Sequence, residues 1–514
     1  MGGFVITGLP DIQTKFEGKV TFYLVLCALI AATGGLMFGY DIGISGGVTS
    51  MDDFLLNFFP LVYEKKKRAK EDNFCKYDNH KLQLFTSSLY LAALVSCLFA
   101  SKMCRGFGRK ITIQVSSIFF FIGVILNVGA DNLHMLIAGR ILLGIGIGFA
   151  NQAVPLFLSE MAPFHVRGAL NILFQLNITI GILVANIVNY YASKIPNGWR
   201  LSLGLAGVPA LILCVGSFII SETPTSLIER GRHAEGLEAL KRVRGTHNVE
   251  AEFKEMLHAS ETARQVERPF MSIFQRTSFP QLVIGASLQF FQQLTGINAI
   301  MFYAPVLFET LGFKNNVSLL SAVTIGIVNV LGTIVSLLTV DRIGRKLLLL
   351  EGCLQMFLSM AAIGAVLMTN TGLNQALDSD SAKGVVIFTA LFVTGFAWSW
   401  GPLGWLIPSE IFPLETRTAG YAVAVSSNML FTFVIAQVYL SMLCRMRAGV
   451  FFFFSMWIAV MGVFVAVFLP ETKNIPLDEM VTRVWKKHWY WKRYMDDGTR
   501  SFKATDILYD AYSY

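Results

Sequence analysis

The sequence predicts an all-α membrane protein in which twelve transmembrane helices form two pseudo-symmetric six-helix halves. Hydrophobic residues make up 54% of the 514 positions and charged residues only 15%, whereas soluble domains are about one-quarter charged. The apolar residues fall in twelve stretches, each near the roughly 20 residues that a helix needs to cross a bilayer. Short charged motifs recur after corresponding stretches in the two parts of the chain, which indicates an internal duplication.

The expected spans are joined by short connections, except after the first and the sixth. They cover residues 20–46, 82–104, 110–131, 134–158, 168–193, 199–221, 280–308, 317–340, 346–369, 384–410, 418–443 and 448–469. The chain then divides into an N-terminal segment 1–19, a first half 20–221 with an outer loop 48–81, a linker 222–278, a second half 279–470 and a tail 471–514. The first apolar run is too long for a cleavable signal, so we expect it to be retained.

Basic residues in the short connections indicate which side of the membrane holds the termini. An even number of spans puts both termini on one side, and positive residues gather in the short loops of the cytoplasmic side. The basic residues on the terminal side are Lys102, Arg105, Arg109, Lys110, Arg167, Arg342, Arg345, Lys346 and Arg417. Both termini are therefore expected in the cytoplasm, although Lys65, Lys66, Lys67, Arg68 and Lys70 in the outer loop oppose this orientation.

Three polar segments outside the spans have helical or aromatic patterns. In the outer loop, the run 51–63 puts Phe54, Leu55, Phe58 and Val62 on one helical face, which either caps the protein or lies on lipid. The linker has helical patterns over 234–244 and 250–258, with the mixed charges of a solvated surface. The tail carries three tryptophans among basic residues, and an interfacial anchor or a solvated segment would both explain them.

The internal repeat is clearest in three charged motifs at the inner ends of the spans. Gly108-Arg109-Lys110 recurs as Gly344-Arg345-Lys346, Ser159-Glu160 with Arg167 recurs as Ser409-Glu410 with Arg417, and Glu222-Thr223 recurs as Glu471-Thr472. The acids can accept hydrogen bonds from the arginines, and such clusters would close the inner side and open for release. Simple positive-inside topology is the alternative explanation.

Two charged residues are expected at membrane depth, Asp41 in the first span and Arg140 near the start of the fourth. A charge there costs at least about 2.5–3.5 kcal/mol, so such residues face the bundle interior and usually pair. A carboxylate in such a pair can take up and release a proton as the pair breaks and forms, which proton coupling requires. A static ion pair, or two charges near the headgroups, would explain the residues equally well.

Amide side chains inside the apolar spans form a second candidate site. They are Gln175, Asn177, Gln289, Gln292, Gln293, Asn298, Asn329 and Asn428. Each amide supplies a donor and an acceptor, as sugar hydroxyls require, although single buried amides often only bond between helices. Trp405 follows Gly401-Pro402, a pair expected to break the tenth span. Its ring offers a flat face for the apolar side of a sugar.

These motifs resemble those of the sugar porter branch of the major facilitator superfamily. The resemblance covers almost the whole chain, and it also rests on Gln292-Gln293-Leu294-Thr295-Gly296-Ile297-Asn298, Gly401-Pro402-Leu403-Gly404-Trp405 and Pro470-Glu471-Thr472-Lys473. Within that branch, the run 38–49 and the outer loop with Cys75 resemble the plant sugar transport proteins, which are proton-coupled hexose importers of the plasma membrane. Two positions depart from the pattern, because Arg105 replaces an acidic residue and Ser221 replaces a proline.

The resemblance implies a major facilitator fold with a cytoplasmic helical linker and an extracellular lid, and roles for particular residues. Asp41 would be the proton acceptor and Arg140 its partner. The sugar contacts would be Gln175, Gln292, Gln293, Asn298, Asn329 and Trp405, with Phe38, Ile182 and Gly401 lining the pocket. The cytoplasmic gate would comprise Arg109, Glu160, Arg167, Glu222, Asp341, Arg345, Glu410, Arg417 and Glu471. A disulfide between Cys75 and Cys444 would fasten the lid to the second half, whereas the sequence alone leaves two free thiols equally open.

The expected function is proton-coupled uptake of monosaccharides, glucose and related hexoses, across the plasma membrane by alternating access. The partners would be the sugar, a proton and the lipid bilayer, and the chain would work as a monomer without cofactor, metal or nucleic acid. A facilitative uniporter, and a sensor that binds sugar without transporting it, are the alternatives. The sequence shows no set of nucleophile, base and orienting residue, so no enzyme is expected.

Overall fold

The computed structural model describes residues 19–67, 73–264, 269–310, 315–370, 379–473, 475 and 480–495. Within these ranges the secondary structure is entirely helical, as the sequence predicts. Residues 1–18 of the expected N-terminal segment, 68–72 of the outer loop and 496–514 of the expected tail lie outside the described residues.

Among the described residues, eleven helical segments are long and apolar enough to cross a membrane. They are α1 (Phe22–Ser50), α4 (His80–Gly106), α5 (Arg109–Val128), α6 (Leu133–Met161), α7 (Arg167–Ala192), α8 (Gly198–Leu205) with α9 (Gly207–Ile219), α16 (Asn315–Ile343), α17 (Arg345–Asn370), α18 (Ser379–Trp398) with α19 (Trp400–Ile411), α20 (Arg417–Met446) and α21 (Gly449–Phe468). The remaining expected span is present as two helices, α14 (Phe279–Leu294) and α15 (Ile297–Thr310), each shorter than a full crossing. The twelve predicted spans are thus all found.

The break between α14 and α15 lies at Gly296, whose φ of +83° is in the left-handed region. Residues with a side chain rarely adopt this conformation, and a Cβ here would also meet the Phe454 ring at 2.8 Å. Gln292 and Gln293 therefore occupy the last turn of α14, and Asn298 lies in the first turn of α15. The break brings these three amides to one level of the bundle.

The break between α18 and α19 differs from the expected position. It lies at Ser399, which has φ −124° and ψ −89°, and Gly401 and Pro402 already belong to the first turn of α19. Proline is well accommodated in a first turn, where its missing N–H would have no partner within the helix. The prediction that the Gly-Pro pair itself breaks the span is wrong by two residues.

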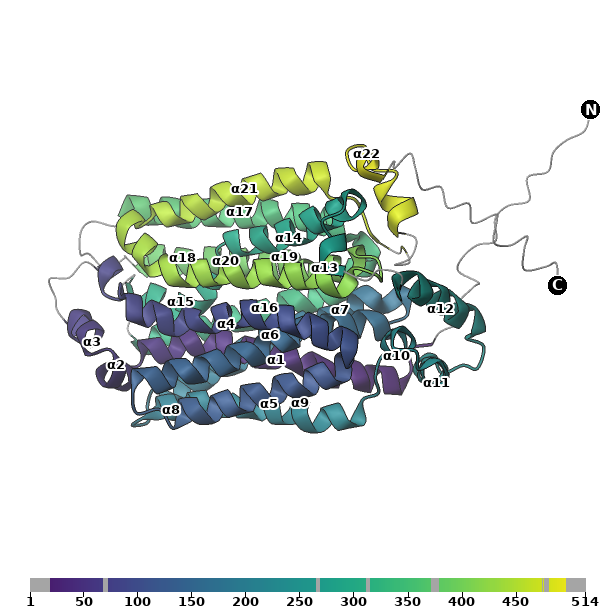
Figure 1. The fold of residues 1–514 in the computed structure, drawn as a ribbon. Helices are drawn as coiled ribbons and strands as arrows, with labels where there is room; N and C mark the ends of the chain where they lie inside the picture. Colours follow the sequence, from purple (N-terminus) through teal and green to yellow (C-terminus); the bar gives the residue numbers. More distant parts are fainter. Residues whose placement is uncertain are drawn as a thin grey trace, which may run out of the picture.

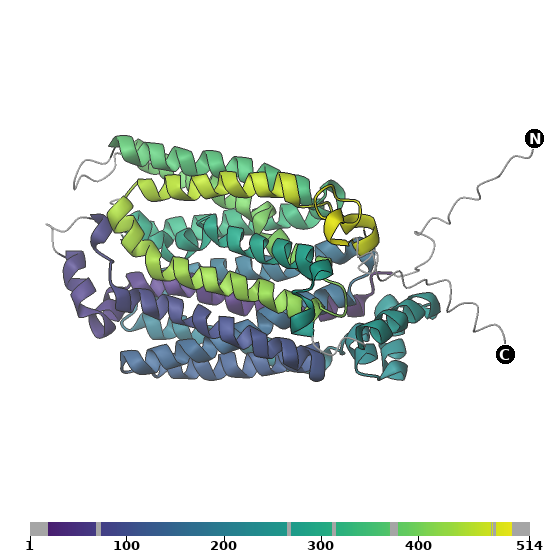
Figure 2. The ribbon, with the colours of Figure 1, turned by 45° about the horizontal axis from the view of Figure 1, so that its top comes forward.

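The membrane helices pack as one bundle in which the two parts of the chain occupy different sides (Figure 1). The purple and blue helices gather below, and most of the green and yellow helices lie above them; the turned view keeps this division (Figure 2). One end carries α10 (Pro224–Glu229), α11 (His233–Arg244), α12 (Glu250–Arg264) and α22 (Lys492–Met495). The opposite end carries α2 (Asp52–Phe58) and α3 (Pro60–Lys67). We refer to these as the linker end and the lid end.

Helix α1 lies unusually close to α7, because glycines form its contact face. Gly35, Gly39 and Gly43 recur every four residues, and a Cβ at any of them would overlap α7 backbone or side-chain atoms. Such small residues allow helices in a membrane to approach at backbone distance. The close approach fixes the depth and rotation of Asp41, which lies on the same part of α1.

The lid consists of α2, α3 and the short helix η2 (Asn73–Cys75). Its amphipathic face covers protein, because Phe54, Leu55 and Val62 are buried. The Phe54 ring lies 5.3 Å from the Phe85 ring of α4 and 5.8 Å from the Trp199 ring of α8, measured between centroids. Of the two interpretations left open by the sequence, the lid is the one that the packing supports.

The described part of the tail packs back on the linker end of the second half. It contains the π-helix η6 (Val481–Trp485) and α22, and the indole N–H groups of Trp489 and Trp491 donate to the carbonyls of Val467 and Phe468 at the end of α21. Trp485 and Trp491 are buried, whereas Trp489 is 63% exposed. Residues 480–495 are therefore a docked segment rather than a solvated one.

Candidate functional site

Asp41 and Arg140 form an ion pair in the core of the first half. Arg140 Nη1 lies 2.5 Å from Asp41 Oδ1, and both side chains are buried. The second carboxylate oxygen, Asp41 Oδ2, is also buried and has no hydrogen-bond partner among the described residues. The structure thus places the two sequence-predicted residues together, with one carboxylate oxygen left open to a proton.

Arg140 has several further contacts besides the carboxylate. Its Nε donates to the Phe85 carbonyl at 3.2 Å, and its Nη2 donates to Ser45 Oγ at 2.9 Å and to the Thr86 carbonyl at 3.4 Å. The guanidinium also lies over the Phe85 ring, 4.9 Å from its centroid. These neutral partners can keep the arginine satisfied when its bond to Asp41 weakens.

A network of amides joins α14, α19 and α20. Gln292 Nε2 donates to the carbonyls of Trp400 and Gly401 at 2.8 and 3.1 Å, and Gln289 Nε2 donates to the Gly404 carbonyl at 2.6 Å. Asn428 Nδ2 of α20 donates to Gln289 Oε1 and Gln292 Oε1 at 2.5 and 2.7 Å. The network fixes the broken helices α14 and α19 against each other.

The other expected sugar contacts surround this network. Asn298 Nδ2 donates to Gln293 Oε1 at 2.5 Å. Gln175 of α7 is buried, and a Cβ placed on Gly401 would lie 3.2 Å from its Nε2, so the two positions are adjacent. Asn329 of α16 is buried as well, and its Oδ1 has no hydrogen-bond partner among the described residues. Asn177 instead donates to the Leu173 carbonyl of its own helix.

Trp405 lies between aromatic rings of the first half. Its ring is perpendicular to those of Phe38 on α1 and Phe174 on α7, with centroids 6.4 and 5.6 Å away. Ile182 of α7 is buried and packs beside α1, since a Cβ on Gly43 would lie 2.9 Å from its carbonyl oxygen. Trp405 of the second half and Phe38 of the first thus meet in the interior of the bundle.

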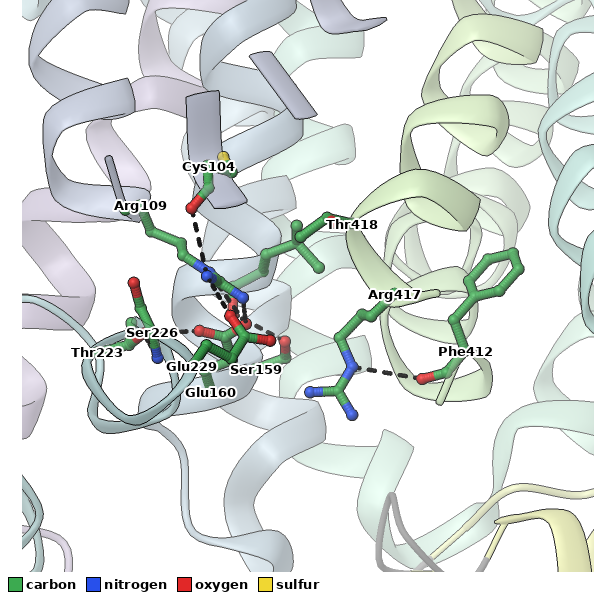
Figure 3. A network of polar contacts seen from close by, with 12 residues as sticks. Cys104, Arg109, Ser159, Glu160, Thr223, Ser226, Glu229, Phe412, Arg417 and Thr418 are labelled. Carbon is green, nitrogen blue, oxygen red and sulfur yellow. Dashed lines mark hydrogen bonds and ion pairs between the residues drawn. The ribbon is translucent and has the colours of Figure 1, made fainter. Parts of the chain in front are cut away.

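At the linker end, Arg109 is the centre of a buried charge cluster (Figure 3). Its guanidinium lies 2.7 Å from Glu160 Oε1 and 2.7 Å from Glu229 Oε2. Glu160 Oε2 accepts a hydrogen bond from Thr223 Oγ1 at 2.6 Å. Glu222 caps the start of α5 by accepting the backbone N–H of Arg109 at 3.0 Å.

The second half repeats this arrangement. Arg345 lies 3.0 Å from Glu410 Oε1 and 3.0 Å from Asp341 Oδ1. Glu471 accepts the backbone N–H of Arg345 at 3.0 Å, as Glu222 does for Arg109. The equivalence of the two clusters supports the internal duplication predicted from the sequence.

Contacts between the two halves at this end involve mainly backbone groups. The Asp341 carboxylate accepts the N–H of Ala169 at 3.0 Å, which caps the start of α7 across the interface. Gln152 Nε2 donates to the Thr418 carbonyl of α20 at 3.0 Å. Arg417 lies beside Glu160 and Arg109 in Figure 3, and its Nε donates to the Phe412 carbonyl at 3.3 Å. Hydrogen bonds to backbone groups thus join the halves at this end, and Arg417 of the second half brings its positive charge close to Glu160 of the first half.

At the lid end, Cys75 of η2 and Cys444 of α20 form a disulfide, with Cα atoms 4.6 Å apart. Next to it, Ser441 Oγ donates to Asp78 Oδ1 at 2.6 Å. Gln83 of α4 donates to both Asp78 and Ser441, at 3.2 and 3.1 Å. The lid is therefore attached to the second half by a covalent bond and by a polar cluster.

Some residues of these sites carry too little signal in the sequence to be predicted. Glu229 was missed because its approach to Arg109 depends on the turn of α10 after Thr223. Ser45 was missed as well, although its place four residues after Asp41, one helical turn along α1, could have indicated it. Gln289 and Asn428 were among the candidate amides, but only the fold shows that Asn428 bridges two glutamines.

Two halves of six spans, joined by a helical linker and enclosing polar side chains in the core, define a multi-pass membrane transporter of the major facilitator fold. The chain belongs to the sugar (and other) transporter family, whose model matches residues 27–485. It is 60% identical over 501 residues to sugar transport protein MST4 of Oryza sativa subsp. japonica, covering 97% of each chain. It is 61% identical over 482 residues to sugar transport protein 8 of Arabidopsis thaliana, covering 94% of this chain and 95% of the relative.

Among solved structures, the chain is similar to the proton:xylose symporter XylE bound to 6-bromo-6-deoxy-D-glucose. The TM-score is 0.78 at 25% sequence identity, and the match covers 90% of this chain and 99% of XylE. The protein is thus a sugar transporter and not an enzyme.

Proposed function

We propose that this protein imports monosaccharides, glucose and related hexoses, together with protons across the plasma membrane by alternating access. Asp41 would carry the proton, the amide network with Trp405 would bind the sugar, and both termini would face the cytoplasm. The proposal draws on the names of the relatives, which are sugar transport proteins, and on the solved neighbour, which is a proton:xylose symporter. The observation that carries it is the buried Asp41–Arg140 pair.

The surroundings of Asp41 suit reversible protonation. A proton on Oδ2, the oxygen without a partner, would cancel the carboxylate charge and weaken the 2.5 Å bond to Arg140. Arg140 would remain held by the Phe85 and Thr86 carbonyls and by Ser45. Breaking the pair therefore does not leave the arginine without hydrogen-bond acceptors, and α1 can move relative to α6.

Helix α1 connects the proton to the sugar. Phe38 lies three residues before Asp41, so both side chains share a face one turn apart. Because the Phe38 ring packs against Trp405, a shift of α1 on protonation would alter the wall of the sugar site. This contact supplies the differential interaction that coupling between two sites requires.

The sugar site would lie among Gln175, Gln292, Gln293, Asn298 and Asn329. Buried amides present donors and acceptors that match pairs of adjacent hydroxyls. The Trp405 ring would lie against the apolar face of the sugar. Phe38, Ile182 and Gly401 would complete the wall of the sugar site. The unpartnered oxygen of Asn329 supports this assignment, because a buried acceptor without a partner is costly unless a ligand satisfies it.

The two ends would open in turn. At the linker end, the clusters around Arg109 and Arg345, together with Glu222, Glu471, Arg167 and Arg417, would form the inner gate. The cap between Asp341 and the start of α7 would be the contact that breaks when the halves separate there. At the lid end, the disulfide and the Asp78 cluster would hold the lid over the proton site.

Uptake in a transporter-deficient yeast tests the proposal. A membrane potential of about 150 mV contributes roughly 3.5 kcal/mol per proton, enough for a few hundredfold accumulation. We expect labelled glucose to accumulate and a protonophore to abolish the accumulation. Uptake that only equilibrates glucose, with or without the protonophore, would indicate a uniporter, and binding without uptake would indicate a sensor.

A further inference from the structure

A cavity of about 410 Å³ lies at the linker end, between the first half of the bundle and the linker helices. Its lining includes Lys110 of α5, Ser221 after α9, and Arg230, Arg232 and Arg242 of the linker. None of these side chains takes part in the proposed proton or sugar sites. The cavity therefore needs a separate explanation.

Two of the four basic side chains are already neutralised. Arg232 pairs with Glu235 at 2.5 Å, and Arg230 lies 3.6 Å from Glu222 while donating to the Phe107 carbonyl at 2.7 Å. Glu222 in turn is satisfied by backbone N–H groups at the start of α5. These residues form the rim of the cavity and leave little charge for a ligand.

The other polar groups are open. The Arg242 guanidinium lies over the Tyr23 ring, 3.9 Å from its centroid, and has no hydrogen-bond acceptor among the described residues. Within the described ranges, the hydrogen bond of Lys110 Nζ is a long contact of 3.5 Å with the Phe218 carbonyl. Ser221 Oγ is buried and has no partner in the part of the chain that the structure describes. The one acid without a described partner, Glu238, is exposed to water.

The internal repeat gives an independent reason to regard this cavity as a site. The offset of 249 residues that relates Glu222 to Glu471 also relates Phe218 to Val467. In the second half the Val467 carbonyl accepts the indole N–H of Trp489 at 3.2 Å, so the docked tail occupies this place. Lys346, the counterpart of Lys110, donates to the Ala466 carbonyl at 2.8 Å. The docked tail thus fills, in the second half, the position that is equivalent to the cavity of the first half.

The cavity also lies next to exposed apolar side chains at the ends of two membrane spans. Phe218 and Ile219, at the end of α9, are 72% and 57% exposed, and Phe107 beside the rim is 62% exposed. Apolar side chains at this level suit acyl chains, and lysine with arginine suits the phosphate of a headgroup. The cavity thus adjoins apolar side chains, and of its two open cationic groups Lys110 is half-buried and Arg242 is exposed.

We propose that this cavity binds a phosphate group, held by Lys110, Arg242 and the Ser221 hydroxyl. The phosphate can come from an anionic phospholipid of the adjacent leaflet or from a soluble phosphate compound. Arginine and lysine donate charge-assisted hydrogen bonds to phosphate oxygens, and a serine hydroxyl adds a neutral donor. Binding would join the linker helix α11, through Arg242, to the membrane helix α5, through Lys110.

Binding to the purified full-length protein in detergent tests this site. The probes are dioctanoyl phosphatidylinositol 4-phosphate, inorganic pyrophosphate and, as the uncharged control, dioctanoyl phosphatidylcholine. We expect saturable binding of the phosphoinositide, at least tenfold weaker in the double variant Lys110→Gln/Arg242→Gln and weaker in Ser221→Ala. Lys346→Gln is the matched control, because the docked tail fills the equivalent position in the second half. This variant should change the affinity for the phosphoinositide less than twofold.

The same titrations identify the source of the phosphate. Competition by pyrophosphate at similar concentration would indicate that a soluble phosphate suffices, whereas no competition would assign the site to the lipid. Saturable binding of neither probe would overturn the proposal, as would equal losses in Lys346→Gln and in the double variant. Glucose-induced thermal stabilisation, retained in every variant, shows that a loss of phosphate binding does not reflect misfolding.

Discussion

Phe54 of the lid packs against Phe85 of α4, with ring centroids 5.3 Å apart, and Phe85 in turn lies beneath the Arg140 guanidinium. A single buried side chain thus separates the lid from the Asp41–Arg140 pair. We infer from this relationship a physical role for the lid, in which the rings keep water away from the pair. Water at an ion pair stabilises its separated charges and weakens the attraction between them.

Substituting Phe54→Ala should therefore make uptake more dependent on acid. Water that enters beside Phe85 would favour the charged carboxylate, so more acidic medium would be needed to protonate Asp41. We expect initial uptake at pH 7, relative to that at pH 5, to fall about tenfold. Leu56→Ala on the same helix is the control, because Leu56 is 54% exposed and should leave the ratio unchanged. An unaltered ratio in Phe54→Ala would contradict this role of the lid.

Removing the disulfide should also make uptake more dependent on acid. Cys444→Ser breaks the covalent link between η2 and α20 and leaves the Asp78 cluster to join the lid region to the second half. We expect a several-fold rise in the KM for glucose at pH 7 and little change at pH 5. Cys214→Ser replaces a cysteine outside the disulfide and serves as the control. Equal KM values for wild type and Cys444→Ser at both pH values would show that the bond is unimportant for transport.

Asn428 should matter for sugar affinity, although the family resemblance does not place this candidate amide among the sugar contacts. Asn428→Ala removes the donor to both Gln289 Oε1 and Gln292 Oε1 and leaves two buried acceptors unsatisfied. An unsatisfied buried group costs about 1–3 kcal/mol, so we expect the KM for glucose to rise roughly tenfold. Asn177→Ala is the matched control, since the described hydrogen bond of the Asn177 side chain is to the Leu173 carbonyl of its own helix. A KM for glucose in Asn428→Ala equal to that of the wild type would show that the amide network does not contribute to sugar binding.

The charge cluster at the linker end should contribute to stability. Glu160→Gln leaves Glu229 as the remaining described ion-pair partner of the buried Arg109, and removing one partner of a buried pair costs about 3–5 kcal/mol. We expect the Tm of the purified protein to fall by several degrees. Glu235→Gln, which breaks an exposed pair, should change the Tm by less than a degree. Similar melting of Glu160→Gln and wild type would show that the cluster does not hold this end closed.

Much of the fold followed from the sequence because membrane spans are long and their charges are rare. The twelve spans and the matched motifs around Arg109 and Arg345 were predicted from hydropathy and from the repeat. Ser399 shows the limit, because the break before α19 depends on how α18 and α19 pack rather than on the nearby Gly-Pro pair. The docking of Trp489 and Trp491 on α21 is likewise beyond the sequence, because composition does not distinguish an anchor from a docked segment.

The candidate site was predictable in its residue types more than in its connections. Asp41 and Arg140 were paired because two charges at membrane depth have few other partners. The role of Phe85 between the lid and Arg140 could not be anticipated, since an apolar side chain in an apolar span carries no signal of its own. Glu229 lies in a short helix whose position depends on the packing of the linker against the bundle.

The central claim is that Asp41 carries the proton. Its most direct test measures the accumulation of labelled glucose, and glucose exchange beside it, in cells that express the Asp41→Asn variant. Asparagine keeps the size of the side chain and its bond to Arg140 but cannot take up a proton. The account predicts that Asp41→Asn still exchanges glucose down its gradient but no longer concentrates it. If Asp41→Asn concentrates glucose as the wild type does, Asp41 is not the proton carrier and the proposed coupling is wrong.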